Sequence, residues 1–313
     1  MRLWILIVVA AKLIVAAIPS SAAGVETDAK RYFIIHADDA GMSHSVNHAT
    51  IAAMENGIVS SASIMVPCPW FKEIAAYAKT HPERDFGIHL TLNCEWKNYR
   101  WGPVAGKYRV PSLVDKEGYL WDSVPEVAAN AKTADVEVEL QAQVQRALDF
   151  GVPLTHLDTH MGALVSRPDL VEAYVNVGVQ FNLPVFFLRN LGNEVPDERV
   201  RARGEQLIAK LEKHKLPVLD YMTQLYTDGS FDEKRVQYLN AIAKSKPGVH
   251  YLILHCGYDD DELRAITASS KRRDTDRRIA TDAEFIRKVK QTGVEIVTWK
   301  QVRDMNDKRA AEK

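Results

Sequence analysis

Short apolar runs alternate with segments of helical periodicity along most of the chain. Eight runs rich in apolar or β-branched residues have the length of buried strands: 32–37, 61–66, 86–92, 154–159, 184–188, 216–221, 250–255 and 294–298. Between them lie stretches with helical signals, at 43–57, 70–80, 135–150, 168–181, 198–214, 232–244 and 281–291. This α/β alternation predicts a parallel sheet covered by helices. About seven to eight such units favour a closed or nearly closed (β/α) barrel over an open sheet.

The first residues have the pattern of a secretory signal. Arg2 precedes an apolar run over 3–18, and small residues follow that run up to Gly24. We therefore expect residues 1–23 to be a signal peptide, which leaves a single domain over 24–313. An uncleaved anchor is the alternative, but Lys12 interrupts a run already short for the roughly 20 residues of a membrane span. The expected destination is the periplasm or the outside of the cell, with no membrane span left after cleavage.

Composition limits the classes of partner and the means of stabilisation. A net charge of −1 gives no reason to expect nucleic acid or another polyanion as partner. Cys68, Cys94 and Cys256 allow at most one disulfide, so the fold must depend on its hydrophobic core. With 46% hydrophobic residues the chain can build such a core. The sequence leaves open whether the chain forms a homo-oligomer.

One connection is much longer than the others and is rich in aromatic residues. It covers 93–133 and includes Trp96, Trp101 and Trp121. Long insertions between barrel elements are usually functional. Flat aromatic faces suit the apolar C–H face of a sugar ring, so we expect these rings to contact substrate. The alternative is a small aromatic core that holds the loop itself together.

Two adjacent carboxylates follow the first predicted strand directly. Asp38 and Asp39 end an apolar run and precede Gly41. Such a pair is costly without a cation or a shared proton. Neighbouring residues at a strand end point to different sides, so one carboxylate can bind a metal while the other moves protons. The alternative is that one aspartate caps the helix that begins near Ser43.

Three further predicted strands have histidine-containing motifs toward their carboxyl ends. His89 lies within an apolar run, where a lone histidine is more often a core residue than a ligand. His156, Asp158 and His160 alternate, so they face one side of their strand. Imidazoles beside a carboxylate are typical of a divalent-metal site with a supporting partner. His255 follows a later strand, and the carboxyl ends of barrel strands meet on one face. We therefore expect all these groups to converge with the two aspartates.

At these positions the chain resembles the YdjC-like carbohydrate deacetylases, which include the chitooligosaccharide deacetylases. The resemblance runs from Tyr32 to Val302, and an ordered set of motifs carries it: Ala37-Asp38-Asp39-x-Gly41, Gly87-Ile88-His89-Leu90, Thr155-His156-Leu157-Asp158-Thr159-His160 and His255-x-Gly257-Tyr258. It implies a distorted TIM-like (β/α) barrel of the glycoside hydrolase/deacetylase type. It also implies a metal held by Asp39, His89 and His160, with Asp38 as catalytic base. One divalent ion, zinc or magnesium, suits this ligand set, and the nitrogen ligands favour zinc.

The chemistry that fits these residues is hydrolysis of an N-acetyl group on an amino sugar or a short acetylated oligosaccharide. Asp38 would take a proton from the attacking water, and His255, or else His156, would protonate the departing amine. Asp158 would support a neighbouring histidine. The alternatives are a glycoside hydrolase and a sugar-binding barrel without catalysis. Adjacent aspartates are poorly placed for a glycoside hydrolase, whose carboxylates face each other across roughly 5–9 Å.

Two positions depart from the family pattern. Met161-Gly162 stand where further histidines usually follow the last ligand, and Cys256 stands where proline is usual. The first change lies beside a predicted metal ligand. The identity of the sugar is therefore not carried over from the family.

Overall fold

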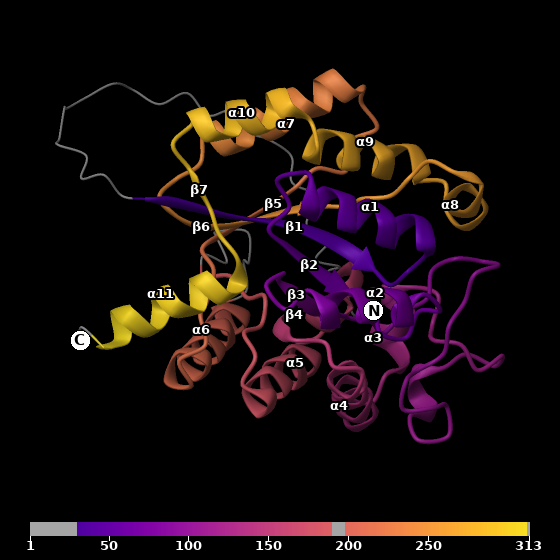
Figure 1. Cartoon of the computed structure of the whole chain (residues 1–313). Coiled ribbons are helices and arrows are strands. Elements are labelled where there is room, and N and C mark those ends of the chain that lie inside the picture. Colours follow the sequence, from indigo (N-terminus) through magenta and orange to yellow (C-terminus); the bar gives the residue numbers. More distant parts are fainter. Residues whose placement is uncertain (1–29, 190–197, 312–313) are drawn as a thin grey trace.

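A parallel sheet forms the centre of the protein. The computed structural model describes residues 30–189 and 198–311, and the predicted signal segment lies outside the described residues. Within them, seven strands pair in the order β4-β3-β2-β1-β6-β5, with β7 added beside β1. All pairs are parallel, so the predicted α/β class is confirmed (Figure 1). The strands are β1 (Arg31–Ala40), β2 (Ser61–Ile64), β3 (Phe86–Leu90), β4 (Leu154–Thr159), β5 (Tyr221–Gln224), β6 (Gly248–Leu254) and β7 (Glu295–Ile296).

Isolated bridges continue the pairing beyond the two edge strands. Leu157 of β4 pairs with Val185, and Leu188 pairs with Leu219 just before β5. The pairing therefore runs from β4 through 184–188 to the approach of β5, and from there through β6 back to β1. This connectivity suits the distorted barrel predicted from the sequence.

Two predicted strands are shorter than the sequence pattern indicates. The run 184–188 contributes only isolated bridges, and 216–221 overlaps β5 at Tyr221 alone. Each run contains a proline, Pro184 and Pro217. Proline has no N–H to donate to a sheet, so continuous pairing is interrupted there.

Helices cover both sides of the sheet. In Figure 1, α1, α9 and α10 lie along one side, and α4, α5 and α6 lie along the other. The described helices are α1 (His44–Glu55), α2 (Phe71–Thr80), α3 (Val124–Asn130), α4 (Thr133–Asp149), α5 (Pro168–Phe181), α6 (Glu198–Lys213), α7 (Phe231–Ala243), α8 (Asp261–Ile266), α9 (Ser270–Ala280), α10 (Ala283–Gln291) and α11 (Trp299–Ala311). None of these helices is long and apolar enough to cross a membrane.

The helices α3, α8, α9 and α11 were not predicted. The clearest case is α9, which lacks a continuous apolar stripe because it is dominated by charged residues. It nevertheless buries Arg273 and Asp276. Both side chains make ion pairs inside the protein, Arg273 with Asp39 and Asp276 with Lys234. Hydrophobic periodicity cannot detect a helix whose inner face is polar.

The start of α1 settles which residue caps this helix. Ser43 is the N-cap, and its hydroxyl accepts a hydrogen bond from the Val46 amide at 3.2 Å. Neither Asp38 nor Asp39 is used as the cap, so both carboxylates are free for other roles.

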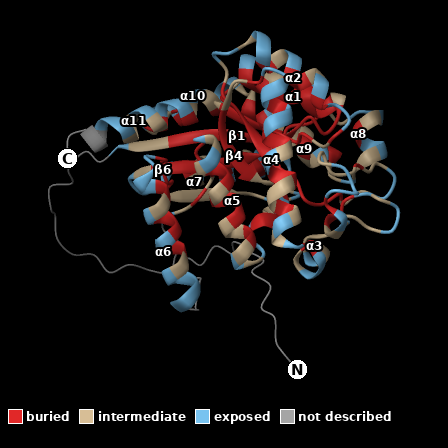
Figure 2. Cartoon of the chain, turned by 90° about the horizontal axis from the view of Figure 1, so that it is seen from below, coloured by how far each residue is buried: buried red, intermediate tan, exposed pale blue. Residues whose placement is uncertain are grey.

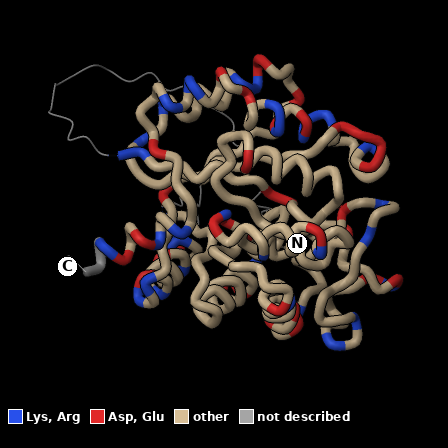
Figure 3. The backbone as a smooth tube through the Cα atoms, in the orientation of Figure 1, with Lys and Arg blue, Asp and Glu red and all other residues tan. Residues whose placement is uncertain are grey.

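The sheet is buried on both faces, as expected for parallel strands between helices. Eight consecutive residues of β1 are buried, from Phe33 to Ala40, and Figure 2 shows this buried interior beneath a partly exposed layer of helices. All three cysteines are free and buried. Basic and acidic residues are interspersed along the outer helices in Figure 3, in keeping with the near-zero net charge.

The long insertion has a structure of its own. It contains the 3₁₀ turn η1 (Pro111–Leu113) and α3. Bridges join Asn93 to Trp121 and Val114 to Leu120. Because Asn93 follows β3 closely, the first of these bridges ties the loop to the strand that carries His89.

Candidate active site

A bulge near the end of β1 sets the position of the two aspartates. The pairing of β1 with β2 shifts register between Ala37 and Ala40, and Asp39 has a φ of +70°. A bulge re-aims the side chains that it carries, and aspartate tolerates the left-handed conformation better than most residues. Both carboxylates consequently lie near Nε2 of His89, Asp39 at 3.3 Å and Asp38 at 3.9 Å.

Asp39, His89 and His160 form a compact group of candidate metal ligands. Oδ1 of Asp39 lies 3.3 Å from Nε2 of His89 and 3.3 Å from Nδ1 of His160. This buried oxygen makes no hydrogen bond of good geometry. One ligand atom from each residue lies within 4.8 Å of the others. Atoms bound at roughly 2.1 Å to one tetrahedral ion are spaced about 3.4 Å apart, so the three residues fit a single divalent ion.

A carboxylate supports each of the two histidines from behind. Nδ1 of His89 lies 2.7 Å from Oδ1 of Asp158, and Nε2 of His160 lies 3.1 Å from Oε2 of Glu95. Such partners fix the orientation of a ligating imidazole and increase its basicity. The contact of Asp158 with a histidine was predicted, whereas Glu95 was not. The only hint of Glu95 in the sequence is its place at the start of the insertion, shortly after β3.

The charges in this group stabilise one another. Burial alone would raise the pKa of Asp39, but the Arg273 guanidinium, with help from His160 and His89, holds it well below its usual range. Burial alone would lower the pKa of His160, but Glu95 and Asp39 raise it to about 9. Carboxylates, with Asp158 first, likewise raise the pKa of His89 well above its ordinary value despite burial. The buried carboxylates therefore favour positive charge on this group of residues.

Asp38 has a different environment from Asp39. Its Oδ1 lies 3.3 Å from Nε2 of His36, and its Oδ2 lies 3.7 Å from Nε2 of His255. It makes no ion pair with His160, and its nearest approach to His89 is 0.6 Å longer than that of Asp39. Asp38 therefore lies beside the candidate ligands and faces histidines that are not among them.

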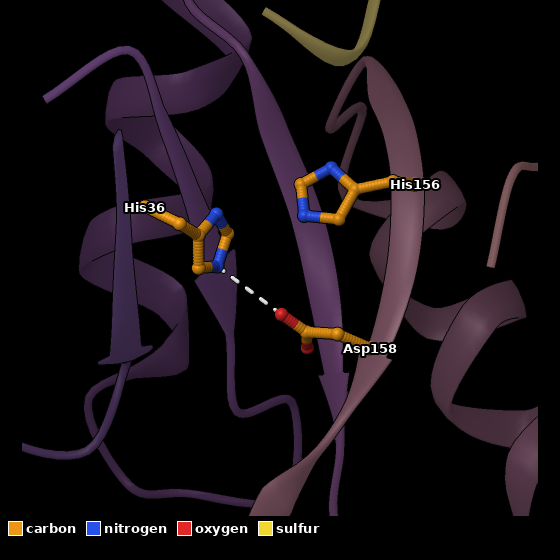
Figure 4. Close-up of side chains that lie close together, drawn as sticks. All are labelled: His36, His156 and Asp158. Atoms are coloured by element: carbon orange, nitrogen blue, oxygen red, sulfur yellow. Dashed lines mark ion pairs between the residues drawn. The ribbon is translucent and has the colours of Figure 1, made fainter. Parts of the chain in front are cut away.

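His36 links the carboxylates of Asp38 and Asp158. Its Nε2 lies 3.1 Å from Oδ2 of Asp158, the contact drawn in Figure 4, and 3.3 Å from Oδ1 of Asp38. His156 points toward the same space from β4 (Figure 4). It is fully buried, stacks on Trp299 with ring centres 5.0 Å apart, and makes no hydrogen bond or ion pair with Asp38. This placement favours His255 over His156 as a proton donor.

A buried ion pair fixes the backbone at His255. The amide of His255 donates to Oδ2 of Asp276 at 3.1 Å. Oδ1 of Asp276 lies 2.7 Å from Nζ of Lys234 and accepts from the Tyr238 hydroxyl at 2.9 Å. Lys234 is fully buried. Burial also lowers the pKa of His255, against the opposing effect of the two aspartates.

The three tryptophans proposed to contact substrate have different positions. Trp101 is 3% exposed and packs in the hydrophobic core, which argues against direct contact with a sugar. Trp96 is partly buried, and its ring meets that of Trp101 edge-on with centres 5.4 Å apart. Trp121 is partly buried, and its Nε1 donates to the Ser112 carbonyl at 2.9 Å. Aromatic residues thus build a core within the insertion, and of the three tryptophans only Trp96 and Trp121 are partly exposed.

The departure from the family pattern lies beside the candidate ligands. Met161 and Gly162 both have positive φ angles, 50° and 68°. Met161 directly follows His160, is 54% exposed, and has its sulfur 3.1 Å from Nδ2 of Asn93. An exposed thioether therefore occupies the surface next to His160.

Comparison with known proteins identifies the family. The family model for YdjC-like proteins matches residues 32–291. A carbohydrate deacetylase from Thermus thermophilus is 31% identical over 238 residues, which are 76% of this chain and 81% of that protein. A carbohydrate deacetylase from Thermoanaerobacter pseudethanolicus is 27% identical over 270 residues, 86% of this chain and 98% of that protein. The chain belongs to the YdjC-like family.

A solved structure has the same fold. It is a protein from Enterococcus faecalis described as a candidate cellobiose-phosphate cleavage protein, and it aligns with a TM-score of 0.73 and 22% identity. The alignment covers 87% of this chain and 99% of that protein. At this level of identity, the likeness supports the fold alone.

Proposed function

We propose that this protein is a metal-dependent carbohydrate deacetylase that hydrolyses the N-acetyl group of an amino sugar or a short acetylated oligosaccharide. One observation carries the proposal: the two adjacent aspartates are divided between two sets of neighbours. Asp39 shares an oxygen between His89 and His160, whereas Asp38 lies beside this group and near His255. The names of the curated relatives support the carbohydrate class of substrate.

Asp39, His89 and His160 would hold one divalent ion, which when bound supplies Lewis acidity to activate water and polarise the acetyl carbonyl. Asp38 would accept the proton of the attacking water. His255 would deliver a proton to the departing amine nitrogen as the carbon–nitrogen bond breaks, giving acetate and the free amine. Asp158 and Glu95 would keep the two imidazoles oriented.

We propose zinc or magnesium as the ion. Two imidazoles and one carboxylate suit zinc better than magnesium, which prefers oxygen ligands. Export to the periplasm or beyond the cell is proposed on the basis of the first 23 residues.

Two alternatives predict different products. A glycoside hydrolase would release a new reducing end, and a sugar-binding barrel would release nothing. The adjacent positions of Asp38 and Asp39 favour the deacetylase. A glycoside hydrolase needs two carboxylates on opposite sides of the scissile glycosidic bond.

The decisive experiment measures products. The chain without residues 1–23 is loaded with zinc or magnesium and incubated with N-acetylated mono- and oligosaccharides, and free acetate and new reducing ends are quantified. We expect acetate without new reducing ends, and loss of acetate release in Asp38→Asn. New reducing ends, or no product from any sugar although metal is bound, would overturn the proposal.

A further inference from the structure

A second group of possible metal ligands lies on the surface, between α1 and α2. His44 and His48 are four residues apart on α1, and Glu73 is on α2. One ligand atom from each lies within 4.8 Å of the others. None of these residues belongs to the buried group around Asp39, so this site would be a separate one.

The positions of the two histidines follow from helix geometry. Residues four apart lie on the same face of a helix, and the rings of His44 and His48 have centres 4.1 Å apart. Nδ1 of His44 lies 2.7 Å from Oε1 of Glu73. Two imidazoles and a carboxylate are a common ligand set for zinc, with water completing the coordination.

An ordinary ion pair accounts for His44 and Glu73 but leaves His48 unexplained. Within the described residues, His48 has no hydrogen bond or ion pair, and its ring contact is with His44. A shared cation would use a nitrogen ligand from each imidazole.

The site is held in place before any ion binds. Oε2 of Glu73 accepts a hydrogen bond from Nδ2 of Asn47 at 2.8 Å, which leaves Oε1 facing His44. At the start of α1, the carboxylate of Glu262 accepts hydrogen bonds from the backbone amides of His44 and Ser45. The side chains of His44 and Glu73 are 44% and 29% exposed, so an ion can reach them from solvent.

We propose that His44, His48 and Glu73 bind a second divalent transition-metal ion, with zinc as the preferred occupant, and that this ion fastens α1 to α2. Asn47 connects the site to the turn after the aspartates, because its Oδ1 accepts from the Gly41 amide while its Nδ2 donates to Glu73. The ion would therefore also stiffen the turn that follows Asp38 and Asp39. The inference does not depend on deacetylase activity.

The test counts zinc in a background whose buried site binds metal only weakly, at a zinc concentration too low to fill that site. Asp39→Asn is dialysed against zinc with and without the second substitution His48→Ala, and bound zinc is measured by elemental analysis. We expect one fewer zinc per chain in Asp39→Asn/His48→Ala than in Asp39→Asn. His214→Ala, which removes an exposed histidine of the chain remote from this group in sequence, is the matched control and should not change the count.

Thermal unfolding gives a second readout. Zinc at one hundredfold its dissociation constant should raise the melting temperature of Asp39→Asn by roughly 4 °C, and this increase should disappear with His48→Ala. Because His48 is exposed, its replacement should leave the fold intact. An equal zinc count in the two variants would overturn the proposal, whether or not the wild-type chain releases acetate.

Discussion

Arg273 donates through Nη2 to Oδ2 of Asp39 at 2.6 Å, although 234 positions separate the two residues in the chain. The guanidinium thereby occupies one oxygen of the carboxylate and leaves Oδ1 facing His89 and His160. Arg273→Met would leave a buried carboxylate without its main cationic partner. We expect the metal-free variant to lose about 3–5 kcal/mol of unfolding free energy, the usual cost of breaking a buried ion pair.

A divalent ion at Asp39 would offset part of that loss. Added metal should therefore raise the melting temperature of Arg273→Met more than that of the wild type, as measured by calorimetry. Arg278→Met, an exposed position on the same helix, should behave like the wild type. Equal metal-induced shifts in Arg273→Met and the wild type would contradict the placement of the ion at Asp39.

The sequence alone predicted that side chains near the carboxyl ends of the strands would lie close together. Asp39, His89 and His160 converge as expected, because carboxyl ends of parallel strands meet at one edge. The partners that surround them were harder to find. Arg273 lies on a helix with no apolar stripe, and Glu95 lies in a loop without a recognisable motif. Such contacts depend on tertiary packing, which neither periodicity nor spacing encodes.

The sequence also could not show which of the three tryptophans is buried. Trp96, Trp101 and Trp121 have the same aromatic chemistry, and nothing in their local pattern separates a ring that holds the loop together from one that contacts solvent. Only the packing of the insertion reveals that Trp101 is buried. The sequence left sugar contact and a loop core as alternatives, and it did not indicate which ring would be buried.

Glu95 offers a test of the support behind His160. Glu95→Gln keeps the shape of the side chain but removes the charge that orients and polarises the imidazole. Loss of such a partner typically costs 10–100-fold in metal affinity, and we expect a loss of this size at the buried site by competition with a chelator. Glu117→Gln, an exposed change in the same insertion, should have no effect. Unchanged affinity in Glu95→Gln would contradict a supporting role for Glu95 behind His160.

Replacing each of the three tryptophans should change either the stability of the protein or its binding of substrate. Trp101→Ala removes a buried ring and should lower the unfolding free energy by about 3–5 kcal/mol. Trp96→Ala and Trp121→Ala should mainly raise KM for the N-acetylated sugar, with metal content unchanged. Denaturant unfolding and acetate-release kinetics on all three variants provide the comparison. If Trp96→Ala and Trp121→Ala both keep the wild-type KM, the insertion serves folding rather than substrate contact.

The sharpest prediction separates the two adjacent aspartates. Asp38→Asn should retain the metal, because the contacts of Asp39 with His89 and His160 are untouched, but it should lose roughly 10²–10⁴-fold in rate with the loss of the base. Asp39→Asn should instead lose metal affinity at the buried site, and activity with it. Excess metal should then partly rescue Asp39→Asn and leave Asp38→Asn unchanged, with circular dichroism confirming that both variants are folded. The reverse rescue pattern would exchange the roles of base and ligand, and full activity in both variants would remove this site from the mechanism.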